Sequence, residues 1–245
     1  MCFHTSYNKS IKSVERQFKV KLSDPSLIPL FDQPQYHLNG FAHPNMLVIP
    51  QERRELLAPG VWGIAPSYIQ PDGLKAYYKE AVRFGGGLNA QSEKLFKHFI
   101  YKQSVLSRRC IIPVSGFFEP HEYLKKKYPF YIHRKDESLL PLAGLYTVIG
   151  TYITFTILTQ AASPLFERIH NLKKRQPVIL NDNSIDDWLN SNLNVPEIQS
   201  LLKTPFPEHE LEAYTVNKDL FSPKVDSNIK SITDRVVYNE LPEIV

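Results

Sequence analysis

Short, mainly apolar segments recur along the chain, and they predict β-strands. The segments are brief, rich in β-branched or aromatic residues, and bounded by proline, glycine, asparagine or aspartate, as strands between turns are. The predicted strands cover residues 46–49, 61–65, 110–114, 116–119, 129–133, 152–158, 178–180 and 211–216.

Apolar residues spaced by three and four predict short helices near residues 11–18, 95–100, 165–169 and 186–189. Prolines outnumber glycines 19 to 10 and interrupt the chain often, so long helices are not expected. Together the elements predict an α+β fold, with a β-rich, barrel-like, mostly antiparallel sheet and short flanking helices.

The chain is large enough to form its own core, because 42% of its 245 residues are hydrophobic and 12% are aromatic. We expect a single domain over residues 1–245, since no repeat or long linker divides it. The stretch from about residue 223 has alternating charges and few large apolar residues, which predicts either a strand or a loosely packed tail.

Charge and cysteine content exclude several classes of protein. The 29 Lys and Arg against 25 Asp and Glu give a formal charge of +4, which permits a nucleic-acid partner without requiring one. Two cysteines exclude a disulfide scaffold and a four-thiolate zinc site, and the eight scattered histidines predict no metal and no cofactor. No apolar stretch nears the roughly 18 residues of a membrane span and no secretory signal opens the chain, so we expect a cytoplasmic protein without a membrane partner.

Cys2, directly after the initiator methionine, is the first residue with distinctive chemistry. A small second residue usually permits removal of the methionine, which leaves an amine and a thiol on adjacent carbons. With ordinary pKa values of about 7.7–8.0 and 8.5, each is partly reactive at neutral pH. The amine can capture an aldehyde as an imine, and the thiol can then close a thiazolidine ring. The same end could instead hydrolyse an amide, or Cys2 could be an incidental residue of a frayed terminus.

Four segments, taken together with Cys2, resemble in order the motifs of the SRAP (SOS response-associated peptidase) family. They are Trp62-Gly63-Ile64-Ala65-Pro66, Asn89-Ala90-Gln91-Ser92-Glu93, residues 108–119 (RRCIIPVSGFFE), and Ile169-His170 running to Arg175-Gln176-Pro177. The resemblance extends from Cys2 to about Trp188, which is most of the chain.

The resemblance implies a compact β-rich fold with a basic DNA-binding groove and a function in DNA damage repair. Members of the family crosslink an N-terminal cysteine to the ring-opened aldehyde of an abasic site in single-stranded DNA, and they were first proposed to be autopeptidases. By position it implies that Cys2 is the nucleophile and that Asn89, Glu119 and His170 are the other catalytic residues.

The chemistry of these three residue types suits that reaction. A carboxyl group can assist sugar ring opening and protonate the carbinolamine oxygen, and a histidine can shuttle protons. An asparagine can hold both the substrate and the terminal amine. Each also has an ordinary structural explanation when taken alone: Glu119 as a strand-end residue, His170 as a helix cap, and Asn89 as a turn residue after the glycine triple 85–87.

The chain departs from the family pattern at several positions. Phe3-His4 stands where the family commonly has Gly-Arg, Gln91 replaces an arginine, Pro120 replaces a tryptophan and Gln176 a methionine, and three extra residues lie between His170 and Arg175. The changes at Phe3-His4 and at Gln91 each remove one expected phosphate contact, whereas the extra residues include Lys173 and Lys174. Tyr68 falls where the family often has a tryptophan and keeps an aromatic face for base stacking.

Single-stranded DNA requires cations for the backbone and aromatic faces for unstacked bases. The predicted DNA-binding residues are Trp62, Tyr68, Gln91, Arg108, Arg109, Phe118, Lys173, Lys174 and Arg175. Contacts of this kind are directed at phosphates, so affinity should fall with salt and show little sequence preference. Residues 125–127, three lysines at an expected hairpin, receive no role.

The first hypothesis is an abasic site processing protein, lyase-like in its chemistry, in which a processed and exposed Cys2 lies beside Glu119 and His170 and forms a thiazolidine with DNA. The alternatives are a self-processing cysteine peptidase and a non-catalytic single-stranded DNA-binding protein. We expect a monomer of bacterial type that associates with the nucleoid when bound to DNA in the SOS response.

Overall fold

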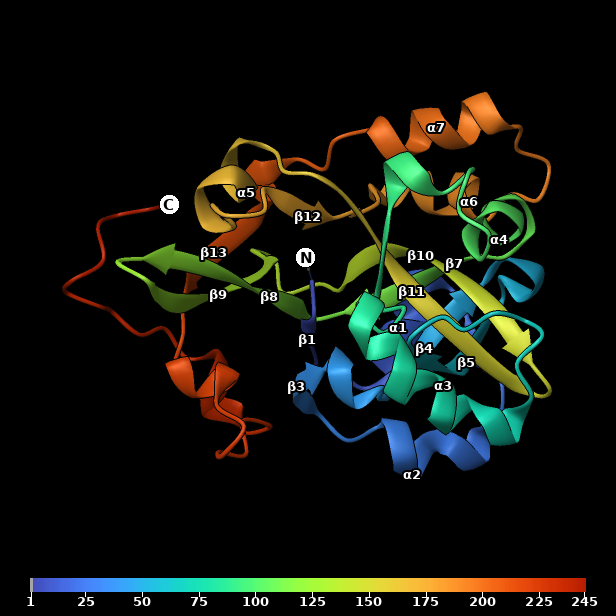
Figure 1. Cartoon of the computed structure of the whole chain (residues 1–245), viewed down its shortest axis with the longest axis horizontal. Coiled ribbons are helices and arrows are strands. Elements are labelled where there is room, and N and C mark those ends of the chain that lie inside the picture. The colour runs from blue at the N-terminus through green and yellow to red at the C-terminus, as the bar shows by residue number, and fades with distance from the viewer. Residues whose placement is uncertain (1) are drawn as a thin grey trace.

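A closed five-stranded barrel forms the centre of the chain in the computed structural model, which describes residues 2–245 (Figure 1). Its strands are β4 (Asn45–Pro50), β5 (Leu56–Trp62), β7 (Arg109–Val114), β10 (Leu140–Ile149) and β11 (Tyr152–Ala161). Neighbours pair in the order β11-β10-β7-β4-β5, and a parallel pairing of β11 with β5 closes the ring. Three short strands pair at its rim: β2 (Lys21–Leu22), β6 (Asn89–Gln91) and β12 (Arg175–Pro177).

A second sheet is antiparallel throughout and lies beside the barrel. It has the order β13 (Leu211–Thr215), β9 (Lys126–Arg134), β8 (Gly116–Tyr123), β1 (His4–Tyr7) and β3 (Gln35–Asn39). Because β1 pairs with β8 from His4 opposite Phe118, the chain entering β1 runs beside the middle of β8. This pairing brings the N-terminal segment into the interior of the fold.

Short helices cover the sheets. They are α1 (Ile11–Phe18), α2 (Ile28–Phe31), α3 (Leu74–Ala81), α4 (Tyr101–Ser107), α5 (Pro164–Ile169), α6 (Ile185–Trp188) and α7 (Val195–Lys203). Among residues 2–245, no helix is both long and apolar enough to cross a membrane.

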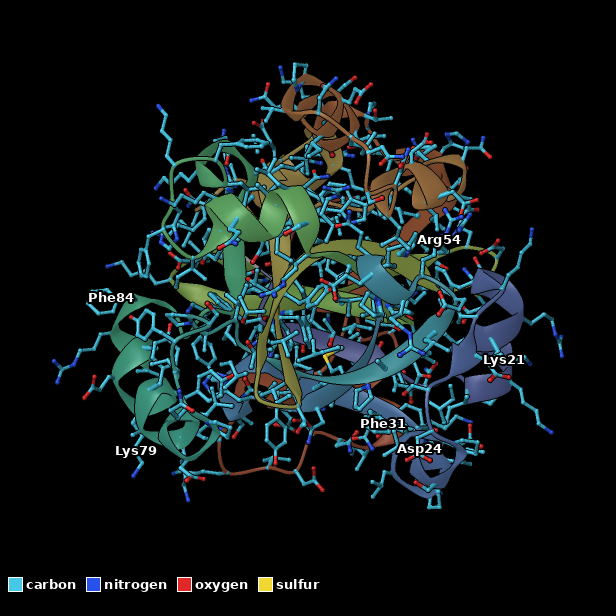
Figure 2. The ribbon with its side chains drawn as sticks, turned by 90° about the vertical axis from the view of Figure 1, so that its right-hand side faces the viewer. Lys21, Asp24, Phe31, Arg54, Lys79 and Phe84 are labelled. Carbon is cyan, nitrogen blue, oxygen red and sulfur yellow. The ribbon has the colours of Figure 1, made fainter. Side chains whose placement is uncertain are left out.

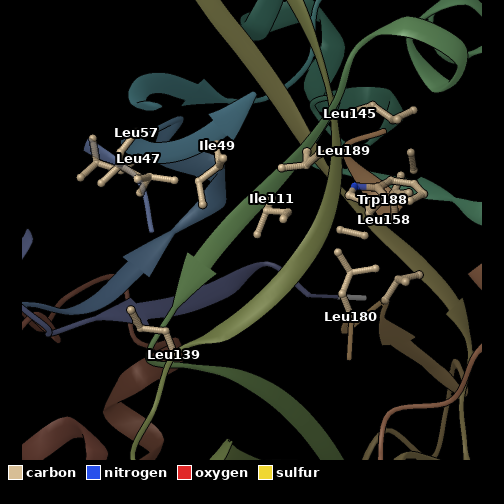
Figure 3. Packing of buried hydrophobic residues seen from close by; sticks show 14 of the residues in the cluster. Leu47, Ile49, Leu57, Ile111, Leu139, Leu145, Leu158, Leu180, Trp188 and Leu189 are labelled. Atoms are coloured by element: carbon tan, nitrogen blue, oxygen red, sulfur yellow. The ribbon is translucent and has the colours of Figure 1, made fainter. Parts of the chain in front are cut away.

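Side-chain alternation along the barrel strands buries apolar residues on both faces. In β4, Leu47 and Ile49 belong to one buried cluster, whereas Met46 and Val48 belong to another. Figure 3 shows the first cluster, in which Leu47 and Ile49 lie in a layer with side chains from the other barrel strands and Trp188. Strands that are buried on both faces hold their register firmly, because a slip of one residue would exchange the two faces.

The predicted fold class is confirmed, but several predicted elements are wrong in position. The strand expected at 61–65 is the end of β5, which begins at Leu56, and 178–180 contributes only an isolated bridge at Ile179 after β12. Residues 95–100 are turns that lead into α4 rather than a helix. The elements not predicted from the pattern are strands β1, β2, β3, β6, β10 and β12 and helices α2, α3, α4 and α7.

The segment after Pro223 forms no strand. Most of its residues are exposed, but the 3-10 helix η10 (Lys230–Thr233) buries Ile232, and the Val236 amide donates to the carbonyl oxygen of Thr215 at 2.8 Å. The segment is therefore anchored against β13.

Candidate active site

Four predicted catalytic residues come from four separate elements. Cys2 directly precedes β1, Asn89 opens β6, Glu119 lies within β8, and His170 is the C-terminal cap of α5. The pairing of β1 with β8 and the packing of α5 on β8 bring these distant segments to one place.

Asn89 holds the backbone of Cys2. Its Nδ2 donates to the Cys2 carbonyl oxygen at 2.9 Å. No donor among residues 2–245 reaches its buried Oδ1. An acceptor buried in this way next to Cys2 is suited to an amine or hydroxyl group that arrives with the reaction.

The backbone just before Asn89 is fixed by close packing. Gly87 has φ +68° and lies so near the backbone of Ile64 that a Cβ atom would collide with it. The buried Trp62 donates from Nε1 to the Leu88 carbonyl oxygen at 2.9 Å. These contacts set the position from which Asn89 reaches Cys2.

Glu119 is a fully buried carboxyl group, with none of its surface exposed. Burial raises its pKa from the usual 4.5 to about 7. The group therefore exists in both protonated and ionised forms near neutral pH, as a general acid and base requires. It also lies near the Cys2 thiol, whose pKa is raised first by burial and then by the charge of Glu119.

His170 contacts Glu119 and is almost completely buried. Its Nδ1 lies 2.9 Å from the Arg175 carbonyl oxygen and 3.7 Å from Glu119 Oε2. Burial lowers the pKa of His170 to about 4, so the imidazole is neutral at pH 7. Nδ1–H then donates to the Arg175 carbonyl, and Nε2 carries the lone pair. The contact with Glu119 is accordingly not an ion pair between a charged imidazole and a carboxylate.

The expected exposure of Cys2 is wrong. Its side chain is fully buried among the apolar residues of the cluster that includes Met46, Trp62 and Leu88. The physical reason is the pairing of β1 inside the sheet, which draws the residue before it into the core. The predicted removal of Met1 concerns a residue outside the described range 2–245.

Three predicted DNA contacts are also wrong, because their side chains are fully buried: Trp62, Arg109 and Phe118. The Arg109 guanidinium donates to the backbone carbonyl oxygens of Trp188, Val105, Leu106 and Asn190, which links α4 and α6. The ring of Phe118 packs against Tyr131, 4.8 Å away. These residues stabilise the fold.

The other predicted DNA-binding residues differ in how available they are. Tyr68 is 71% exposed, Lys173 and Lys174 lie at the surface, and Gln91 and Arg108 are partly exposed. The Arg175 guanidinium binds Glu93 through two nitrogens and also donates to Thr159, so its charge is already compensated. Lys173, Lys174 and Tyr68 therefore offer the most accessible groups of this set.

A highly exposed aromatic residue was missed. Phe84 ends the 3-10 helix η5 (Val82–Phe84) and is 91% exposed, five residues before Asn89. Figure 2 places Phe84 and Lys79 at the outer edge of the molecule. A large aromatic residue directly before the glycine triple 85–87 was the signal that could have identified it, since such a loop tip cannot bury the ring.

Within residues 2–245, no group of three or more His, Cys, Asp or Glu side chains is arranged to hold a metal ion. The arrangement offers instead a thiol, a carboxyl group with a shifted pKa, a neutral imidazole and an amide.

Comparison with known proteins yields one family and several relatives. The profile of the family described as SOS response associated peptidase (SRAP) matches residues 1–223. The chain is 32% identical over 217 residues to the abasic site processing protein YoqW of Bacillus subtilis, covering 82% of this chain and 91% of that protein. It is 28% identical over 160 residues to the abasic site processing protein HMCES of Xenopus tropicalis, covering 55% and 45%.

A solved structure is similar over almost the whole fold. A protein from Bacteroides thetaiotaomicron superimposes with a TM-score of 0.83 at 27% identity, covering 96% of this chain and 100% of that chain. The barrel and the adjoining sheet are therefore a shared architecture.

Proposed function

Since the chain belongs to the SOS response associated peptidase (SRAP) family, we propose that it processes abasic sites in single-stranded DNA by forming a thiazolidine crosslink through Cys2. The relatives matched above are named abasic site processing proteins, which supports the substrate. The covalent step is our inference from the residues around Cys2.

One observation carries the proposal: Cys2 lies among an amide, a carboxyl group and an imidazole from three other parts of the chain. Asn89 donates a hydrogen bond to the Cys2 carbonyl oxygen, and the charge of Glu119 raises the pKa of the Cys2 thiol. His170 contacts Glu119. Sequence separations of 87 residues or more make this arrangement a product of the fold rather than of local structure.

The reaction has two bond-forming steps. The amine of a chain that begins at Cys2 adds to the sugar aldehyde, and the carbinolamine loses water to give an imine. Protonated Glu119 gives its proton to the departing hydroxyl group, which leaves a protonated imine and the Glu119 carboxylate. The thiol then adds to the imine carbon and gives its proton to the Glu119 carboxylate, so the ring closes on a neutral nitrogen and the acid is restored.

Neutral His170 supports Glu119 in this cycle. With Nδ1–H held by the Arg175 carbonyl oxygen, its Nε2 is oriented as an acceptor. Such an acceptor can take the hydroxyl proton of the sugar during ring opening. Its pKa of about 4 makes it a weak base, so Glu119 carries most of the proton transfer.

The need for a free amine on Cys2 sets a condition on this chemistry. The amine exists on Cys2 only when the chain begins there, so a species lighter by one methionine is required. Intact mass measurement of the purified protein checks this condition directly.

Four exposed residues could contact the DNA strand. Tyr68 and Phe84 offer faces for unstacked bases, and Lys173 and Lys174 offer charge for phosphates. Affinity should therefore fall as salt is raised.

Self-processing is a second candidate, favoured by the position of Glu119 at the Cys2 thiol. The bond that precedes Cys2 is an amide, and a thiol beside a carboxyl group can attack it. An N-terminus that stays unprocessed in Glu119→Gln would support this activity. The two reactions are compatible, because cleavage would create the amine that crosslinking needs.

A denaturing gel tests the crosslink. The protein is incubated with an oligonucleotide that contains one abasic site, heated, and examined for a slower band. Cys2→Ala should lose this band and keep reversible binding to the same strand. Cys110→Ala is the matched control, since Cys110 is equally buried but lies within β7, and it should keep the band. A heat-stable band that persists in Cys2→Ala would refute the proposal.

A further inference from the structure

A groove of about 460 Å³ with a mixed polar and apolar lining lies beside β1, away from Glu119. Residues alternate across a strand, so Phe118 of β8 points to the opposite face from Glu119. His4 pairs with Phe118, and the ring of His37 meets Phe118 edge-on at 5.7 Å. The groove is closed on its far side by residues 220–223 and 225–228.

A chain of three hydrogen-bonding side chains forms one wall of the groove. His4 Nδ1 lies 2.8 Å from His37 Nε2, and His37 Nδ1 lies 2.6 Å from the Ser227 hydroxyl. His37 is 91% buried, whereas His4 and Ser227 are partly exposed. The protons of this chain can lie in either direction, so His4 Nε2 can present a donor or an acceptor.

The wall is held in place by Asn228. Its Oδ1 accepts from the backbone amides of Tyr36 and His37 at 2.8 and 3.2 Å, and its Nδ2 donates to Gln35. This residue thus continues the hydrogen bonding of the edge strand β3. The far side of the groove is therefore attached firmly enough to define a shape.

The groove is unsuited to phosphate. Of the described residues that line it, Asp226 is the only charged one, and it is acidic. Burial lowers the pKa of His4 to about 3 and that of His37 to about 4, so both imidazoles are neutral at pH 7. An uncharged, flat group with hydrogen-bonding edges fits this lining best, and the ring of Phe221, 5.4 Å from that of His4, offers an apolar face.

Two aromatic side chains, Phe3 and Phe41, lie between the active site and the groove. Phe3 follows Cys2, and its carbonyl oxygen accepts from the Gly40 amide at 2.8 Å. Its ring lies 4.8 Å from that of Phe41, which is 46% exposed, and the next residue, Ala42, lines the groove. A strand that leaves Cys2 across these rings arrives at the groove.

We propose that this groove holds a nucleobase of the bound strand, one or two nucleotides from the abasic site, and that the protein consequently depends on the base at that position. The inference rests on the proposed function and adds sequence-context recognition to it. The far wall includes residues 225–228, which lie beyond the family match that ends at 223.

Binding to strands with altered neighbours tests the inference without the chemistry. The Cys2→Ala variant is titrated with oligonucleotides that carry an unreactive tetrahydrofuran site. The two nucleotides on either side are replaced in turn by A, C, G, T or a second base-free spacer. At one position, the spacer should weaken binding about tenfold, in line with the loss of one base contact.

Substitutions in the groove then test whether this base dependence comes from the groove. His37→Phe keeps a ring against Phe118 and removes the hydrogen-bonded chain, and Ser227→Ala changes only its exposed end. Both should bind the spacer strand and the natural strand alike at that position, whereas His209→Ala, exposed and outside the groove, should keep the difference.

Two results would overturn the inference: equal affinity for all four bases and the spacer at every flanking position, or a base dependence unchanged in both groove variants. A protein that crosslinks normally but shows either result keeps the proposed function and lacks the base site. Absence of crosslinking in the unaltered protein would instead refute the proposed function, while the binding comparison would stand.

Discussion

Two sets of buried titratable groups lie in or next to β1, and burial shifts their pKa values in opposite directions. On one side the pKa of Glu119 rises to about 7, which places its proton exchange at physiological pH. On the other side the pKa values of His4 and His37 fall to about 3 and 4, which removes theirs from that range. Burial disfavours the charged form in each case. The charged form is the deprotonated one for a carboxyl group and the protonated one for an imidazole, so the two pKa values move in opposite directions.

The difference assigns separate roles to the two sides. Acid-base chemistry can occur where a carboxyl group is buried beside the Cys2 thiol. The histidine pair remains neutral and can only exchange hydrogen bonds, which suits recognition. His170 is also neutral, like His4 and His37, but it lies on the other side, in contact with Glu119.

The largest expected effect comes from removing the acid. Glu119→Gln keeps the size of the side chain but cannot exchange a proton, so the rate of crosslinking should fall by roughly 10²- to 10⁴-fold. Quench-flow or manual sampling on denaturing gels measures the rate. Glu122→Gln, on the same strand and partly exposed, should be close to the unaltered protein. Equal rates in the two variants would mean that Glu119 has only a structural part.

The pH dependence of the rate should identify the group. Crosslinking should increase as the amine loses its proton toward about pH 8 and decrease as Glu119 ionises above about pH 7, giving a maximum between them. In Glu119→Gln the inflection near pH 7 should disappear. If that inflection survives the substitution, another group donates the proton.

A smaller effect is expected at the imidazole. His170→Asn keeps an N–H near the Arg175 carbonyl oxygen but loses Nε2, so the rate should fall about tenfold, the low end of acid-base contributions. Affinity for an unreactive strand, measured by fluorescence anisotropy, should not change. A parallel decrease in affinity would show that His170 shapes the site instead.

The smallest effect concerns stability. Folded-state pKa values below 6.5 mean that His4, His37 and His170 contribute stability above about pH 6.5, which is lost as the pH falls toward 4. Glu119 has the opposite sign, since its contribution is present below pH 4.5 and lost as the pH rises through about 7.

His37→Gln removes one of the three imidazole contributions. Between pH 7 and pH 5 the Tm of both proteins should decrease, and the decrease should be smaller in His37→Gln than in the unaltered protein by about 3 °C. Calorimetry measures the shift, and His209→Gln, at an exposed histidine, serves as control. Identical shifts in the two variants would contradict the neutrality of the histidine pair.

The composition of short apolar segments was enough to predict the fold class and most barrel strands. It was insufficient for β1, whose four residues His4–Tyr7 do not form such a segment and are strand-like only through pairing with β3 and β8. Helix α7 did carry a local signal, a capping box between Asn194 and Glu197, which the apolar spacing alone overlooks.

Residue order indicated the candidate site, but it contained no information on which face each side chain occupies. Trp62 and Arg109 have the chemistry of DNA contacts, but both are buried. Trp62 donates to the Leu88 carbonyl oxygen, and Arg109 donates to carbonyl oxygens of α4 and α6. The burial of Cys2 likewise follows from long-range pairing. The pKa of Glu119 could not be anticipated either, since it depends on complete desolvation.

Mass spectrometry of the adducted N-terminal peptide tests the central claim most directly. After reaction with an abasic oligonucleotide, nuclease digestion and iodoacetamide treatment, the peptide that begins at Cys2 should carry one sugar remnant with the loss of one water and no alkyl group on sulfur. A sugar on a lysine, or a Cys2 thiol that is still alkylated in the adduct, would contradict ring closure at the aminothiol.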